Sequence, residues 1–148
     1  MKMTSDNLKM QFESKSVNEG FARAATAAFV SRLDPTVEEL NDIKTAVSEA
    51  VTNCIVHAYD NNVGKIYITA DCLDNGTVKI KIRDVGKGIE DIKKAREPLF
   101  TTGGSDRAGL GFSVMETFSD RISVRSTVGK GTTVTLYKKI EGRKSDKG

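Results

Sequence analysis

Glu49 and Asn53 are the two residues whose types and spacing are best suited to chemistry. They lie four residues apart in the run SEAVTN, and a helix would place both side chains on one ridge. Carboxylate and carboxamide oxygens can hold a hydrated magnesium ion, and a carboxylate can also take a proton. The ridge continues to His57 without a cation to pair with Glu49, which favours a chemical role. From the helix alone, a solvated polar face remains the alternative.

A second group, DVGKGI at 84–89, directly follows the strand-like run TVKIKIR. The carboxylate of Asp84 could accept a hydrogen bond from the exocyclic amine of adenine. Gly86 and Gly88 would leave out side chains where a flat base must lie. An ordinary turn at the end of a strand has the same composition, so this group alone indicates a nucleotide pocket only weakly.

Two further stretches suit phosphate and base. In TTGGSDRAGLGF, Gly109 and Gly111 are expected at a loop-to-helix junction, where backbone N–H groups and the helix dipole attract phosphate. Arg107 precedes them and could reach a terminal phosphate oxygen. In GKGTT at 129–133, which is first of all a hairpin turn, Thr132 could offer a hydroxyl to the base.

The strands that would position these residues follow from alternating apolar residues. The pattern predicts strands at 8–13, 66–72, 78–82, about 122–128 and 132–137, with turns at DNG and GKG.

The predicted helices begin with capping-box spacing. Ser16 and Glu19 open the first helix, which the run LDP ends, and Thr36 and Glu39 open a longer one that reaches about Tyr59. The expected apolar stripes are Val17, Phe21, Ala24, Ala25, Ala28 and Phe29 in the first helix, and Val47, Ala50, Val51, Cys54, Ile55 and Ala58 in the second. A short helix follows Ile89 and another begins near Leu110. This order predicts an α+β fold, a two-layer sandwich with a mixed or antiparallel sheet covered by helices on one face.

Composition narrows the possible functions. The 148 residues fit one domain, with a polar tail at 141–148, and the hydrophobic content of 38% is ordinary for a soluble globule. The net charge is only +3 and the basic residues are scattered, so we expect no direct DNA binding. No membrane-length apolar run or signal peptide is visible, and Cys54 and Cys72 fit buried free thiols in a reducing cytoplasm. A single histidine argues against a histidine-based metal site.

The runs SEAVTNCIVHAY, RDVGKGI, RAGLGF and GKGTTV resemble, in order and spacing, the N box and the three glycine boxes of the GHKL (Bergerat-fold) ATPase and kinase superfamily. The resemblance covers about residues 7–139. Within that superfamily, the runs NEGFARAATAAFVSRLDPTVEELNDIKTAVSEAVTN and REPLFTTG are most similar to the anti-sigma-F factors of endospore-forming bacteria, which are stand-alone serine kinases.

The resemblance implies roles for individual residues. Glu49 would be the catalytic general base and Asn53 would bind magnesium, while Asp84, Gly86 and Gly88 would receive the adenine of ATP or ADP. The remaining nucleotide contacts would be Thr101, Gly109, Gly111 and Thr132, with Arg107 as a catalytic residue beside the γ-phosphate. Residues from about Pro98 to Ala108 would form the ATP lid, which is shorter and richer in glycine than the usual pattern.

The resemblance also implies partners. A cytoplasmic homodimer would bind a sporulation sigma factor, sigma F, and would phosphorylate a serine of its anti-anti-sigma antagonist. Arg23, which the predicted stripe leaves pointing outward, matches an arginine on the surface that both partners use; a solvated surface charge is the alternative. The alternative functions are a general-stress anti-sigma kinase, a nucleotide-dependent binding module without kinase activity, and an α+β domain with no nucleotide site.

Overall fold

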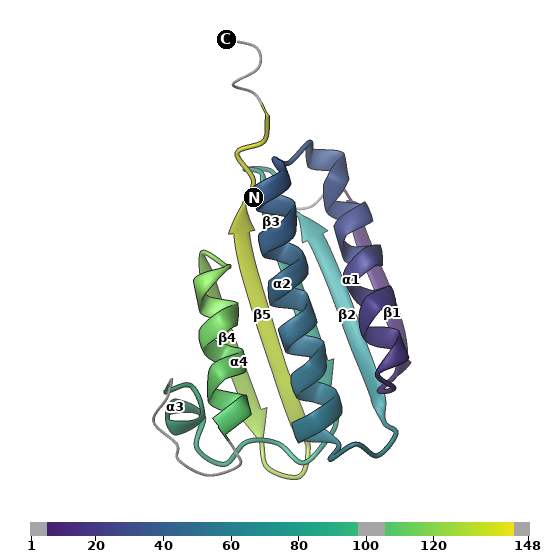
Figure 1. Cartoon of the computed structure of the whole chain (residues 1–148), viewed down its shortest axis with the longest axis vertical. Helices are drawn as coiled ribbons and strands as arrows, with labels where there is room; N and C mark the ends of the chain where they lie inside the picture. Colours follow the sequence, from purple (N-terminus) through teal and green to yellow (C-terminus); the bar gives the residue numbers. More distant parts are fainter. Residues whose placement is uncertain (1–5, 98–105, 144–148) are drawn as a thin grey trace.

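The computed structural model describes residues 6–97 and 106–143, which form a five-stranded antiparallel sheet with helices on one face (Figure 1). The strands are β1 (Asp6–Glu13), β2 (Lys65–Cys72), β3 (Thr77–Asp84), β4 (Arg121–Thr127) and β5 (Gly131–Lys139). The helices are α1 (Val17–Val30), α2 (Val37–Asn53), α3 (Ile92–Ala95) and α4 (Asp106–Thr117), with a 3-10 turn at Ser31–Leu33 and a π-helical turn at Cys54–Ala58. The order in the sheet is β1-β2-β3-β5-β4, so the α+β prediction is confirmed and the sheet is antiparallel throughout.

The two central strands show why the sheet has one apolar face. Ile66, Ile68, Ile80 and Ile82 are almost completely buried, and the register places Ile68 opposite Ile82. Successive strand residues point to opposite faces, so the residues between them point away from the helices. The inward face forms the core with α1, α2 and α4, which lie side by side across it (Figure 1).

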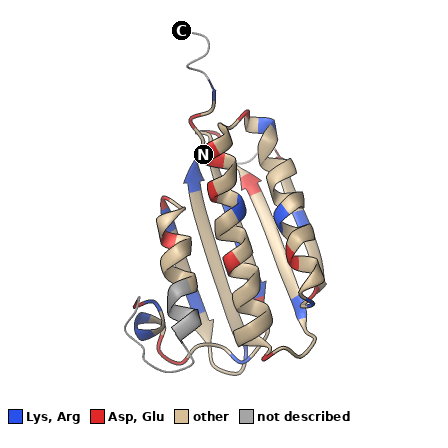
Figure 2. Ribbon diagram, viewed as in Figure 1, with Lys and Arg blue, Asp and Glu red and all other residues tan. Residues whose placement is uncertain are grey.

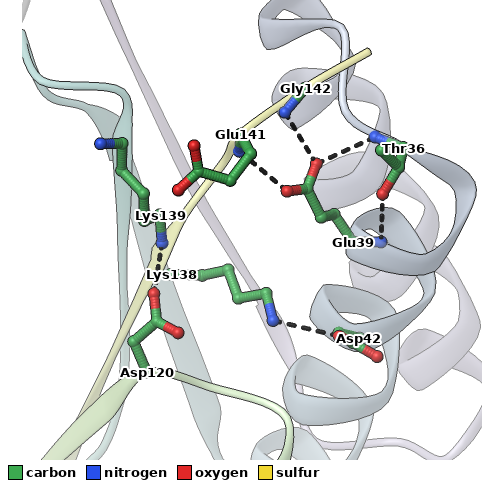
Figure 3. Close-up of polar contacts among 8 residues, drawn as sticks. All are labelled: Thr36, Glu39, Asp42, Asp120, Lys138, Lys139, Glu141 and Gly142. Atoms are coloured by element: carbon green, nitrogen blue, oxygen red, sulfur yellow. Dashed lines mark hydrogen bonds and ion pairs between the residues drawn. The ribbon is translucent and has the colours of Figure 1, made fainter. Parts of the chain in front are cut away.

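Helix α2 begins as the sequence predicts. The Thr36 hydroxyl accepts a hydrogen bond from the Glu39 backbone N–H at 3.0 Å, and the Glu39 carboxylate accepts one from the Thr36 N–H at 2.9 Å. The same carboxylate also accepts from the backbone N–H groups of Glu141 and Gly142, at 2.8 and 3.1 Å (Figure 3). Burial raises the pKa of Glu39, but these hydrogen bonds outweigh it and hold the pKa below its ordinary value. The predicted α2 stripe is buried from Val47 to Ile55, with Ala58 partly buried.

The predicted apolar stripe of α1 is wrong in most positions. Phe29 is buried as expected, but Val17 and Phe21 are 78% and 58% exposed, and Ala24 and Ala28 are exposed too. The buried side chains of α1 are instead Ala22, Thr26, Ala27, Phe29 and Val30. The helix has small or apolar residues on nearly every side, so periodicity could not select the face that packs on α2.

The capping box predicted at Ser16 and Glu19 does not form. Ser16 has helical backbone angles, φ −59° and ψ −27°, and its side chain makes no capping hydrogen bond. The Glu19 carboxylate instead accepts a hydrogen bond from the Ser48 hydroxyl and lies 3.7 Å from the guanidinium of Arg23. Glu19 therefore joins α1 to α2 rather than capping its own helix.

The region after β3 differs from the prediction at one boundary. A short helix follows Ile89 as expected, whereas α4 begins at Asp106, four residues before the predicted start. Arg96, just after α3, binds the Glu116 carboxylate through its guanidinium and so joins α3 to α4. In the described part of the chain, no helix has both the length and the apolar character needed to cross a bilayer.

Candidate functional site

A cavity of about 210 Å³ lies between the C-terminal end of α2, the end of β3 at Asp84, the start of β5 at Thr132, and α4. Its apolar lining residues are Ala50, Ala58, Ile82, Ile89, Ala95, Phe112 and Val134, and its other lining residues are Asn53, Cys54, His57, Asp84, Lys87, Gly88 and Thr132. Largely apolar walls with a few polar groups are typical of sites for flat organic ligands. The cavity brings together Asn53, Asp84, Gly88 and Thr132, four of the residues that the sequence selects.

Asp84 is the buried carboxylate of this cavity, with 5% of its surface exposed. Its Oδ1 accepts hydrogen bonds from the backbone N–H groups of Gly86, at 3.0 Å, and Thr132, at 3.2 Å. Burial raises the pKa of Asp84, and hydrogen bonds from Gly86, the Cys54 thiol and Thr132 partly offset that rise. Two backbone N–H groups thus fix one oxygen of a carboxylate that is surrounded by largely apolar walls. Such a position suits an acceptor for a hydrogen bond from a ligand N–H.

Ser126 is a residue of the site that sequence reasoning missed. Its hydroxyl oxygen accepts from the Ile89 N–H at 2.7 Å and lies 2.7 Å from the hydroxyl oxygen of Thr132. It therefore ties the loop after β3 to the floor of the cavity. The signal was available, because Ser126 follows Ile122 and Val124 at alternate positions and so interrupts an otherwise apolar strand face.

The two glycines after Asp84 have a packing role that the sequence did not predict. A Cβ on Gly86 would lie 2.4 Å from the carbonyl oxygen of Ala58, and one on Gly88, where φ is +82°, would lie 2.4 Å from the carbonyl oxygen of Thr127. Both directions meet protein backbone rather than the cavity. The glycines let this loop pack against the end of α2 and the β4–β5 turn, which in turn holds Asp84 in place.

Asn53 lies where the α-helix α2 gives way to a π-helical turn. It is the last α-helical residue before the π-helical turn at Cys54–Ala58, whose residues Cys54, His57 and Ala58 line the cavity. π-helical turns are rare in proteins, and those that occur are often found at functional sites. A Cβ on Gly111 would lie 2.8 Å from the Asn53 Oδ1, so a larger residue there would displace this side chain from its present position.

Glu49 lies outside the cavity, in a groove between α1 and α2. Arg23, Lys44 and Ser48 line the same groove, together with Asn41 and Thr45. Lys44 of α2 borders the groove too, but no side chain in the described part of the chain forms an ion pair with Glu49. Arg23 does not simply point away from the molecule, since it joins Glu19 and borders the groove that contains Glu49.

The model of the family described as histidine kinase-like ATPase domain matches residues 12–138. An anti-sigma F factor of Caldanaerobacter subterraneus subsp. tengcongensis is 58% identical over 134 residues, which cover 90% of this chain and 93% of the relative. The anti-sigma F factor of Geobacillus kaustophilus is 49% identical over 95% of this chain and 97% of its own length. The chain belongs to the anti-sigma F factor family.

Solved structures confirm the fold of this anti-sigma F family member. A crystal structure of the RsbU and RsbW domains of Rv1364c from Mycobacterium tuberculosis matches 92% of this chain and 32% of that one, with a TM-score of 0.68 and 20% identity. The mycobacterial sensor histidine kinase MprB matches 89% of this chain and 96% of its own, with a TM-score of 0.55 and 15% identity. The ATPase domain implies that the chain binds nucleotide.

Three predicted site residues lie wholly or partly outside the described region of this family member. Thr101 falls in 98–105, which the structure does not describe. Arg107 and Gly109 belong to the first turn of α4, rather than to a loop ahead of it, and only their backbone is described. Their predicted contacts with phosphate stay predictions.

The donor set is compatible with magnesium held mainly by a nucleotide. Across residues 6–97 and 106–143, no group of three or more His, Cys, Asp and Glu side chains could hold a metal ion alone. Magnesium commonly takes one or two protein ligands and completes its shell with phosphates and water. The Asn53 amide, on the cavity wall beside Gly111, can supply one such oxygen.

Proposed function

We propose that this chain is an ATP-dependent serine kinase that also binds a sporulation sigma factor, sigma F, and inactivates its anti-anti-sigma antagonist by phosphorylation. The observation that carries the nucleotide part is the Asp84 carboxylate, buried among apolar walls with Oδ1 fixed by two backbone N–H groups. The names of its anti-sigma F relatives support the partner part. A cytoplasmic homodimer is part of the same proposal.

The cavity accounts for binding of ATP or ADP. The ionised carboxylate of Asp84 would accept the exocyclic amine of adenine, and the side chains of Ile82, Ile89 and Val134 would enclose the ring. The Thr132 hydroxyl, already beside Ser126, would complete the polar floor. Both nucleotides carry the same base, so this part of the site would not distinguish them.

Glu49 and Asn53 account for the chemistry. Glu49 would orient the serine hydroxyl of the antagonist and take its proton as the oxygen attacks the γ-phosphorus of ATP, with ADP as the leaving group. A magnesium ion held in part by Asn53 would offset the charge on the phosphates. One helical turn separates Glu49 in the α1–α2 groove from Asn53 on the cavity wall, so α2 itself would bring acceptor and donor together.

Arg23 would dock the partners beside Glu49. Its side chain is 43% exposed and borders the same groove, and its guanidinium lies near the Glu19 carboxylate. A planar guanidinium that keeps exposed donors suits recognition of partner carboxylates. If both partners contact Arg23 they exclude each other, and the nucleotide state could decide which of them binds.

The decisive experiment follows the labelled γ-phosphate of ATP to the co-encoded anti-anti-sigma protein. We expect label on one serine of that protein and none on a variant in which this serine is alanine. Nucleotide binding without any transfer would leave a nucleotide-dependent binding module as the function. Transfer to the antagonist of a general-stress sigma factor instead would establish the general-stress kinase.

The docking role of Arg23 is tested separately. Arg23→Glu should leave ATP affinity unchanged and weaken binding of both partners by about 2 kcal/mol or more, as expected for a hot spot. Lys15→Glu makes the same charge change at an exposed residue outside the groove and serves as the control. Equal retention of both partners by the two variants would limit Arg23 to a surface charge.

A further inference from the structure

The sheet face opposite the helices collects basic side chains that are scattered in the sequence. The register of β3, β5 and β4 sets which side chains point outward, because Asp84, Ile82 and Val134 point inward. Six outward side chains on these three strands are basic and none is acidic: Lys79, Lys81, Arg83, Lys139, Arg121 and Arg125. We call this surface the basic sheet face.

The charge of this face is large compared with that of the whole chain. The net charge of the chain is +3, so with six positive charges on this face the rest of the molecule is net negative by three. Figure 2 shows Asp and Glu on the helix α2, on the opposite side of the sheet. The modest net charge of the chain therefore conceals a concentration of positive charge on this one face.

The positive charges are not neutralised by the protein. Among the described residues, none of the six basic side chains forms an ion pair within 4 Å. Two acidic residues lie at the border of the face: Asp71, opposite Lys79 on the neighbouring strand β2, and Asp120, whose carboxylate accepts a hydrogen bond from the Lys139 backbone N–H. The positive electrostatic potential of the face can therefore attract an anionic partner.

A shallow groove of about 510 Å³ runs over this face. It is lined by Lys79, Lys81, Arg83, Ser123, Arg125, Thr133, Thr135 and Tyr137. The Arg83 guanidinium lies 4.1 Å from the ring centre of Tyr67, and that of Arg121 lies 3.8 Å from the ring centre of Tyr137. Stacking on a ring limits the motion of both cations before any partner binds.

The side-chain types favour a phosphate backbone as the partner. Amine, guanidinium and hydroxyl donors are the groups that contact phosphates in protein–DNA complexes. No outward residue on β3, β5 or β4 is aliphatic, so the face lacks the apolar centre of a typical protein–protein interface. It also lacks the apolar side chains that insert into a membrane surface.

The rings on this face favour a duplex over a single strand. Single-stranded nucleic acids are held largely by bases stacked on open aromatic rings, whereas arginines already cover Tyr67 and Tyr137. A flat sheet face also presents no element that enters a groove to read base edges. We propose that the basic sheet face binds the phosphate backbone of duplex DNA without reading its sequence.

The proposed DNA binding differs from the expectation of no direct DNA binding, which rested on net charge and on the spread of basic residues along the chain. Binding would keep the anti-sigma factor close to the DNA on which transcription begins. The face lies across the sheet from the helix layer that contains the Arg23 groove and the nucleotide cavity. DNA and nucleotide would therefore bind independently.

The test compares two triple variants of the full chain with equal changes in net charge. One carries Lys79→Glu, Lys81→Glu and Arg125→Glu on the basic sheet face; the control carries Lys15→Glu, Lys93→Glu and Arg143→Glu, all at exposed residues elsewhere. Binding to a labelled duplex is measured by fluorescence anisotropy over a range of salt. Unfolding curves and ADP titration establish that both variants are folded and bind nucleotide.

We expect the wild-type chain to bind unrelated duplexes alike, with a Kd of about 10⁻⁴ to 10⁻⁶ M near physiological salt. The face variant should lose about tenfold or more in affinity relative to the control variant, and its salt dependence should be flatter by about two to three logarithmic units per decade of salt. Excess ADP should not displace the duplex.

Four results would overturn the proposal. They are no duplex binding at low salt, equal loss in the two triple variants, displacement by ADP, and tighter binding to single-stranded DNA or to anionic lipid vesicles than to the duplex. The last result would assign the face to one of those partners instead.

Discussion

The polar groups at the two ends of α2 have different surroundings. At its start, Thr36 and Glu39 satisfy each other's backbone, and Glu39 also binds the chain after β5 (Figure 3). At its end the winding changes to a π-helical turn, and the side chains around it line a cavity. The capped end uses its polar groups for stability, whereas the cavity end places the Asn53 side chain on the wall of the cavity.

The surroundings of the two ends reinforce this contrast. Near the capped end, Lys138 of β5 pairs with Asp42 of α2 at 3.0 Å, and both side chains are largely buried (Figure 3). Near the cavity end, burial raises the pKa of the Asp84 carboxylate, and no side chain in the described part of the chain forms an ion pair with it. A carboxylate whose charge is costly in the free protein gains more from a ligand N–H, which is the arrangement expected of a binding site.

The largest expected effect is on catalysis, at the cavity end. Glu49→Gln should reduce transfer of γ-phosphate to the anti-anti-sigma protein by about 10²-fold or more, because an amide cannot take the serine proton. Nucleotide affinity should stay the same, since Glu49 does not line the cavity. Single-turnover transfer of label, with nucleotide titration as control, measures both. A wild-type rate would remove Glu49 from the mechanism.

The next effect is on folding, where the loop after β3 meets the end of α2. Gly86→Ala should destabilise the chain by about 2 to 3 kcal/mol, because its Cβ would lie 2.4 Å from the Ala58 carbonyl oxygen. Gly20→Ala is the matched control. Its Cβ meets no atom closer than 3.6 Å in α1, so better helix propensity should raise stability by up to about 1 kcal/mol. Equal denaturation midpoints for the two variants would contradict the packing role of Gly86.

A third change separates binding from stability. Asp84→Asn should weaken ATP and ADP alike by about tenfold, or 1.4 kcal/mol, measured by calorimetry. Because the folded pKa of Asp84 is raised, its ionisation costs stability as pH rises from about 3.8 through the folded value, and that cost persists at neutral pH. The variant without nucleotide should therefore be at least as stable as the wild type at pH 7. Unchanged affinity in a folded variant would refute the adenine assignment.

At the capped end, the effect should be smaller and confined to stability. Thr36→Ala removes the acceptor for the Glu39 N–H and should cost about 1 kcal/mol in denaturant unfolding. Nucleotide affinity should not change, because the cap lies at the other end of α2 from the cavity. A parallel loss of affinity would show that the two ends are coupled.

The smallest effect depends on pH. The pKa of Glu39 is lowered on folding, so its contribution is present above the ordinary glutamate value of 4.5 and is lost as pH falls through the folded value. Glu39→Gln keeps one acceptor oxygen but loses the charge, so its stability should fall less steeply below about pH 4.5 than that of the wild type. Parallel acid-unfolding curves would show that Glu39 is not a source of the acid dependence.

Local sequence patterns were sufficient where one arrangement was much better than the others. The strands were predictable because alternation leaves a single way to bury β2 and β3, and the Thr36 cap because both of its partners lie within one turn. The box motifs selected four of the residues that line the cavity, namely Asn53, Asp84, Gly88 and Thr132. The apolar walls and Ser126 were not selected, because each is ordinary in its own segment and becomes part of a site only when β3, β5 and α4 converge.

The sequence by itself thus determined the elements, the α2 stripe and the order of the motifs, since these depend on neighbours within a few residues. Only the tertiary structure decided which face of α1 is buried: packing on α2 covers Thr26 and leaves Phe21 exposed. It also decided that Glu19 binds Ser48, that Gly86 packs on Ala58, and that six scattered basic residues share one face. Each of these outcomes depends on contacts between residues far apart in the chain, and no local pattern records which distant partner a side chain will meet.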